Sequence, residues 1–109
     1  MLKTSQDFYK NPDKYLIKLE QQISKYHDNF DKKLLKNAYY FSFNRHLFQL
    51  RDSGDPYAYH PYEVAKILAE LKFDSICIIS ALLHDTVEDG VAKNCEIKSN
   101  FGEEIGYLV

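Results

Sequence analysis

The stretch from Arg51 to Asp89 gathers the side chains of this sequence that can carry metal and acid–base chemistry. His84 and Asp85 come at the end of an apolar run that we expect to form a helix, where buried polar groups are costly without partners. A divalent cation would offset that cost, because imidazole nitrogen and carboxylate oxygen are both suitable ligands. The pair therefore predicts a metal site at a helix end.

His60 is the predicted third ligand, because of its place in the expected topology. A helix should begin near His60 and carry an apolar stripe through Leu71, and only the short segment 73–75 separates it from the next helix. Helices joined by so short a turn pack as antiparallel neighbours. The start of the first helix then lies beside the end of the second, so His60 is expected near His84 and Asp85.

Three further charged residues complete the set. Glu88 and Asp89, one helical turn beyond Asp85, would flank such an ion and could act on a metal-bound water as general base or acid. Arg51, just ahead of the turn at 53–56, could hold an anionic or planar group. Each residue alone also has a structural interpretation, as a solvated helix end or a surface ion pair. Only the combined spacing favours a functional site.

Composition bounds the class of protein. The chain has 109 residues, 45% of them hydrophobic and 28% charged, which is typical of one small globular domain or part of a larger one. Its net charge of −2 argues against broad attraction to nucleic acid. Cys77 lies in an apolar run and is interpreted as a buried small hydrophobe, while two cysteines without a disulfide framework suit a reducing compartment. No apolar run reaches the ~18 residues of a membrane span, so a cytoplasmic protein is expected.

The apolar spacing predicts helices rather than strands, and the expected class is all-α. The expected helices cover about residues 13–26, 31–48, 60–71 and 75–89, and another begins at 101–105. Residues 1–12 are polar and expected to be frayed, and 91–100 to be a loop with at most one short helical turn. Residues 76–79 fit a buried strand as an alternative, but the run continues in helix formers. The aromatic residues at 39–48 favour a helix buried on more than one side over an aromatic binding surface.

This sequence resembles the N-terminal hydrolase domain of the RelA/SpoT family, a branch of the HD superfamily of metal-dependent phosphohydrolases. The family pattern appears here as HLFQLRDSGDPYAYHPYEVAKILAELKFD, SALLHDTVEDG and FGEEIGYLV. The similarity covers about residues 38–109, with the signature region at 46–109. It implies an HD-domain-like helical bundle and an enzyme that acts on the alarmone (p)ppGpp.

The resemblance also implies roles for the residues in these motifs. His60, His84 and Asp85 correspond to ligands of a manganese ion. Glu88 and Asp89 correspond to the pair that positions or activates the attacking water. The implied reaction removes the 3′-pyrophosphate of (p)ppGpp, giving GDP or GTP and pyrophosphate.

The substrate pocket is where this sequence departs from the family pattern. The resemblance places Arg51 against the guanine base and Ser53 nearby in the nucleotide pocket. Asp52, however, stands where the family has a basic residue, and an acid there should repel a highly phosphorylated substrate unless it points away. Phe48 replaces a glycine of the family, and Gly90 replaces a threonine.

The family supplies a further aspartate ligand and more nucleotide contacts from helices that follow the position of residue 109. We therefore expect a C-terminally incomplete bundle, a weakened manganese site, and an open apolar face at Ile105, Leu108 and Val109. That face would support self-association or docking of a complementary chain. The alternatives to an active hydrolase are a catalytically inactive remnant or interaction module, and one half of a split enzyme.

Overall fold

The computed structural model describes residues 2–47 and 58–109, with side chains described from residue 6 onward. Within these ranges the chain forms seven α-helices and no strand, which confirms the all-α prediction. The helices are α1 Leu2–Lys10, α2 Pro12–Ser24, α3 Lys32–Arg45, α4 Tyr59–Glu70, α5 Ser75–Glu88, α6 Asn94–Phe101 and α7 Glu103–Leu108. None of them is long and apolar enough to cross a membrane.

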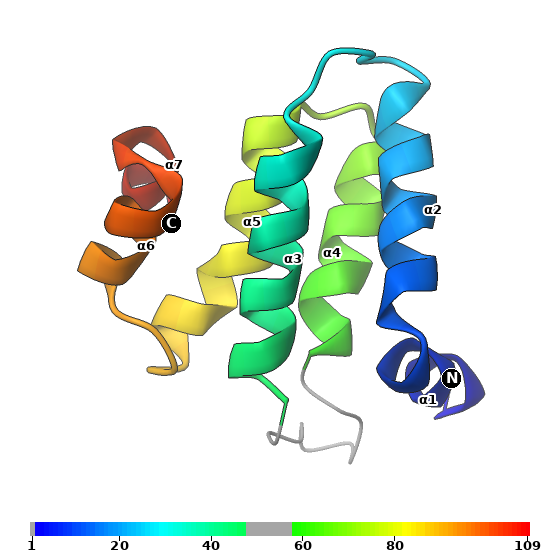
Figure 1. The fold of residues 1–109 in the computed structure, drawn as a ribbon, viewed down its shortest axis with the longest axis horizontal. Helices are drawn as coiled ribbons and strands as arrows, with labels where there is room; N and C mark the ends of the chain where they lie inside the picture. Colours follow the sequence, from blue (N-terminus) through cyan, green and yellow to red (C-terminus); the bar gives the residue numbers. More distant parts are fainter. Residues whose placement is uncertain (1, 48–57) are drawn as a thin grey trace.

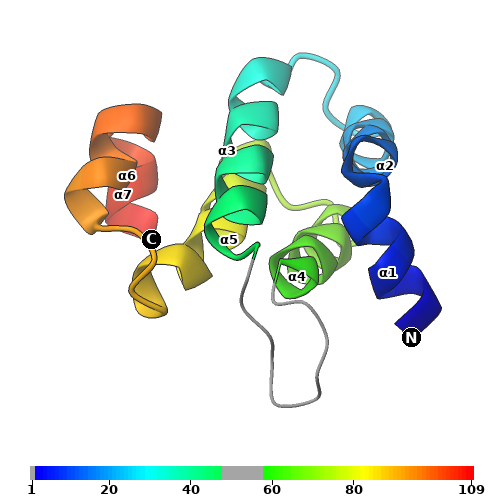
Figure 2. The ribbon, with the colours of Figure 1, turned by 60° about the horizontal axis from the view of Figure 1, so that its bottom comes forward.

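Helix α5 is central in the arrangement (Figure 1). It packs against α3 on one side and α4 on another, and α7 contacts it as well. Helix α2 lies along α4, and α1 crosses the end of α2 and also touches α4 (Figures 1 and 2). The apolar character of α5 explains this position, since a helix that is apolar nearly all round needs neighbours on several sides.

The expectation that residues 1–12 are frayed is wrong. Residues 2–10 form α1 and Pro12 begins α2, and Phe8 on α1 is only 1% exposed. The Phe8 ring contacts five other aromatic rings, with centroid separations of 5.2–6.1 Å; these belong to Tyr15, Tyr39, Phe43, Tyr59 and Tyr62. One aromatic side chain thus fixes a segment whose other residues are mostly polar.

The aromatic density of α3 is explained by burial on two sides, as predicted. Tyr39 and Phe43 face the cluster around Phe8. Phe41 points to the other side, where it meets Phe101 of α6 at 5.4 Å in an edge-to-face arrangement. The alternative of an aromatic binding surface is not needed to account for these residues.

Helix starts follow the capping chemistry of the sequence. Asp31 and Asp74 each accept a hydrogen bond from a backbone N–H three residues later, both at 2.9 Å. Helix α4 begins at Tyr59, two residues before Pro61, although proline favours the first helical position. In the third position its missing N–H still costs no intrahelical hydrogen bond.

The segment 91–100 was expected to be mostly loop, and this prediction is wrong. It contains α6, whose Ile97 is fully buried. Arg45 of α3 ties α6 to the bundle: its guanidinium donates to the Val91 carbonyl at 2.8 Å, pairs with the Glu96 carboxylate and lies over the Phe41 ring. These contacts are long-range, which is why local sequence patterns did not reveal the helix.

Helix α7 packs closely on α6, and this changes the expected apolar face. A Cβ at Gly106 would lie 2.2 Å from Lys98 Cγ, so glycine permits the close approach. Ile105 is buried at 2% exposure, in contrast to our expectation that it is open. Of the three residues expected on that face, Leu108 is the most exposed, at 49%, and its neighbour Tyr107 is 87% exposed.

Candidate metal centre

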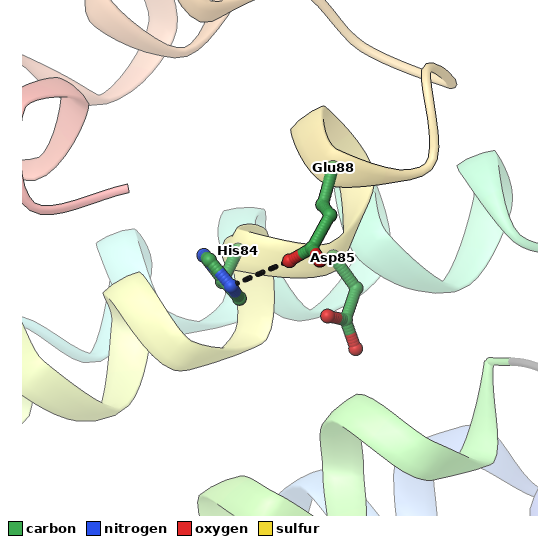
Figure 3. A group of neighbouring side chains, drawn as sticks. All are labelled: His84, Asp85 and Glu88. Carbon is green, nitrogen blue, oxygen red and sulfur yellow. Dashed lines mark ion pairs between the residues drawn. The ribbon is translucent and has the colours of Figure 1, made fainter.

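The antiparallel packing of α4 and α5 brings His60 close to Asp85, as the topology predicted. The His60 Nε2 atom lies 3.7 Å from Asp85 Oδ2. His60 sits in the first turn of α4 and Asp85 in the last turn of α5, so two distant parts of the sequence meet here. The Asp85 side chain points from α5 toward α4 (Figure 3).

His84 contacts the carboxylate one turn further along the same helix. Its Nε2 lies 2.8 Å from Glu88 Oε2, a short charge-assisted contact (Figure 3). One ligand atom from each of His84, Asp85 and Glu88 can be chosen so that all three lie within 4.8 Å of one another. Glu88 therefore joins the predicted ligands His84 and Asp85 in one group, while His60 is not part of that group and approaches it through Asp85.

These groups border a hollow of about 430 Å³ between α4, α5 and α7. Its walls combine the predicted ligands with apolar and small side chains; the lining residues are His60, Val64, Cys77, Ser80, Ala81, His84, Asp85 and Leu108. The hollow is thus polar at the ends of α4 and α5 and more apolar along the rest of its walls. Such a combination is typical of small-molecule sites.

Cys77 was interpreted as a buried core residue, and this is corrected by the structure. Cys77 is only partly buried and lines the hollow. Desolvation and the nearby Asp74 raise the pKa of the Cys77 thiol, so it stays protonated at neutral pH. The helical spacing could have predicted this position of Cys77. Cys77, Ala81, His84 and Glu88 recur every three or four residues, so they lie along one face of α5.

Asp89 is set apart from the ligand group. It caps the C-terminal end of α5, and its Oδ2 atom lies 3.4 Å from Nε2 of His46, a residue fully buried at the end of α3. Our sequence interpretation gave His46 no role.

The predicted substrate contacts, Arg51 and Ser53, lie outside the residues that the structure describes. Phe48 and Asp52 lie outside them as well.

The donor groups present suit a divalent cation. With metal–ligand bonds of about 2.1 Å, neighbouring ligand atoms of an octahedral ion lie about 3 Å apart and opposite ones about 4.2 Å apart. Among the three predicted ligands, the 3.7 Å between His60 Nε2 and Asp85 Oδ2 lies between these two values. His60, His84 and Asp85 would hold the ion, and their mixed nitrogen and oxygen donors suit first-row divalent metals.

Comparison with known proteins finds matches over most of this chain. An HD-domain family model matches residues 38–109. A GTP pyrophosphokinase of Myxococcus xanthus is 48% identical over 87 residues, which cover 80% of this chain and 12% of the relative. A GTP pyrophosphokinase of Brucella melitensis is 45% identical over 91 residues, or 84% of this chain and 12% of the relative.

A third relative bears a hydrolase name. The guanosine-3′,5′-bis(diphosphate) 3′-pyrophosphohydrolase of Aquifex aeolicus is 44% identical over 91 residues, covering 84% of this chain and 13% of the relative. The chain belongs to the HD-domain family, in the RelA/SpoT branch that its motifs predicted. It spans about an eighth of the length of these relatives.

Proposed function

We propose that this chain is a metal-dependent phosphohydrolase of the (p)ppGpp 3′-pyrophosphohydrolase type. The observation that carries the proposal is the approach of His60 on α4 to Asp85 on α5, in the wall of a hollow that His84 also lines. The similarity to the Aquifex aeolicus hydrolase supports the choice of substrate class. A cytoplasmic location is part of the same proposal.

The metal is proposed to be manganese, held by His60, His84 and Asp85. When bound, a divalent cation lowers the pKa of its water and stabilises charge developing on a phosphoryl oxygen. His84 Nε2 either carries a hydrogen toward Glu88 or offers its lone pair to a cation, and it cannot do both. With His84 Nε2 directed to a cation, the Glu88 carboxylate would no longer be paired with His84.

Glu88 and Asp89 are proposed to orient the attacking water and accept its proton. A freed Glu88 remains next to the ligand group, within the 4.8 Å set that it forms with His84 and Asp85. A carboxylate at that distance is suited to general base catalysis, directly or through one water. Arg51 and Ser53 are proposed to bind the guanosine part of the substrate, in keeping with the family resemblance.

The test is pyrophosphate release from ppGpp by the purified chain with manganese, with His84→Ala as the matched variant. We expect turnover that disappears in His84→Ala, together with loss of manganese binding measured by calorimetry. Unchanged manganese affinity in the variant would refute the ligand assignment. A folded chain that binds manganese without releasing pyrophosphate would instead favour the inactive remnant, the interaction module or the split enzyme.

A further inference from the structure

His46 is a buried polar residue that the proposed function does not use. It follows α3 directly, is 0% exposed, and its backbone N–H donates to the Ser42 carbonyl at 3.1 Å. An imidazole inside a protein is costly unless its nitrogen atoms have partners. The partners of its two ring nitrogens therefore define what the side chain does.

The first nitrogen anchors the ring to its own helix. Nδ1 lies 3.1 Å from the Ser42 carbonyl oxygen. A carbonyl oxygen only accepts hydrogen bonds, so we assign the hydrogen of this contact to Nδ1. The imidazole is thereby held by its own helix, and Nε2 is presented in a fixed direction.

The second nitrogen faces the candidate catalytic pair. Nε2 lies 3.4 Å from Asp89 Oδ2, a distance longer than an ordinary hydrogen bond but within that of an ion pair. Since a carboxylate is also an acceptor, this contact is attractive when a hydrogen lies between the two atoms. An imidazole with a hydrogen on each nitrogen can donate to the Ser42 carbonyl through Nδ1 and to the Asp89 carboxylate through Nε2.

Asp89 needs such a partner because of where it sits. It lies at the C-terminal end of α5, where the helix dipole disfavours a negative charge. Gly90 follows with a φ of 75°, so the chain leaves the helical direction immediately after Asp89. The Asp89 side chain keeps 24% exposure, so the contact with His46 does not remove it from solvent.

We infer that His46 is a positioning residue, which holds the Asp89 carboxylate through Nε2 while its own ring is anchored by the Ser42 carbonyl. This inference rests on the proposed function, in which Asp89 helps to orient the attacking water. It connects α3 to the catalytic end of α5. Outer partners of this kind typically contribute about 10- to 100-fold to activity in metal sites.

The kinetic test compares His46→Leu with His46→Gln, in the full chain with manganese and ppGpp. We expect kcat to fall 10- to 100-fold in His46→Leu, while KM and manganese affinity change by less than about threefold. Gln retains an N–H donor at similar reach, so it should recover a large part of kcat. Equal losses in both folded variants, or wild-type kcat in His46→Leu, would overturn the inference.

A spectroscopic test stays decisive if the buried substitutions prevent folding or the chain shows no turnover. In uniformly ¹⁵N-labelled protein, Asp89→Asn should shift the ring nitrogen signals of His46, and the matched Glu88→Gln should leave them unchanged. Absence of a shift in Asp89→Asn would refute the contact. Lack of pyrophosphate release by the wild-type chain, with the shift present, would refute the proposed hydrolase function and leave His46 as the partner of Asp89.

Discussion

Glu88 occupies a position that suits two different roles. Its carboxylate lies 2.8 Å from His84 and within the group that can hold a cation, so it can serve as a base or as a further ligand. Replacing Glu88 by glutamine distinguishes the two roles, because loss of a base lowers kcat, whereas loss of a ligand lowers metal affinity as well. An amide in place of the carboxylate removes the base while keeping the packing.

We predict that Glu88→Gln lowers kcat by about 10²- to 10⁴-fold, as expected for loss of a general base. Manganese affinity should change by less than about threefold, measured by calorimetry alongside the pyrophosphate assay. Glu103→Gln, an exposed substitution on α7, is the matched control. A parallel fall of affinity and kcat in Glu88→Gln would instead make Glu88 a metal ligand.

The sequence predicted contacts between site residues where the order of the helices determines them. The proximity of His60 to Asp85 was predictable, because antiparallel packing of two helices joined by a short turn requires it. The contact between His46 and Asp89 was not, since α3 and α5 are separated by the long stretch 47–74. Nothing in local spacing shows which residue of α3 faces the end of α5.

Helix α1 illustrates how one side chain can attach an element. The Phe8 ring inserts among aromatic residues of α2, α3 and α4, so its burial links the N-terminal helix to three others. We predict that Phe8→Ala destabilises the protein by about 3–5 kcal/mol, the typical cost of truncating a buried phenylalanine. The free energy of unfolding from urea titration measures this loss.

Ile17→Ala provides the control, because Ile17 on α2 is 51% exposed. Its effect should stay within about 0.5 kcal/mol, as for other surface substitutions. A Phe8→Ala loss as small as that of Ile17→Ala would show that α1 is not anchored by this ring.

The helices that could be predicted are those whose own residues show apolar spacing or a capping residue. Helices α2 to α5 had apolar spacing and, at α3 and α5, aspartate caps, so their existence and rough bounds followed from sequence. Helix α6 is short and is held by Arg45 from another helix, a contact without a local signature. Helix α1 was missed because its attachment depends mainly on Phe8.

Two acidic groups make the stability of the whole molecule dependent on pH. Hydrogen bonds from Lys14, Tyr15 and Asn11 lower the pKa of Asp7 from 3.8 to about 2. Arg45 and the Lys93 backbone lower the pKa of Glu96. For Asp7, a folded-state pKa below the unfolded value means that the stabilisation is present above about pH 4 and is lost as the pH falls toward 2.

We predict that the difference in unfolding free energy between wild type and Asp7→Asn narrows as the pH is lowered from 4 to 2. In the wild-type chain Asp7 becomes protonated over this interval, so the charge that distinguishes the two proteins disappears. Denaturant unfolding at several pH values measures the narrowing. A difference that stays constant through this interval would show that Asp7 has no lowered pKa in the folded chain.

Self-association is a second prediction for the whole molecule. The exposed apolar surface at the C-terminal end is smaller than the sequence suggested, since Ile105 is buried and Tyr107 and Leu108 remain. We predict concentration-dependent association that Tyr107→Ser weakens, measured by sedimentation velocity. A strictly monomeric profile at high concentration would rule it out.

The Cys77 thiol in the wall of the hollow can report whether the hollow is occupied, through the rate of its alkylation. Cys95 is exposed, so replacing it by serine would leave a chain with one thiol, in the wall of the hollow that the candidate metal ligands also line. The raised pKa of Cys77 makes its alkylation slow at neutral pH. Any molecule that fills the hollow would slow it further, so ligand occupancy becomes measurable as thiol protection, independently of turnover.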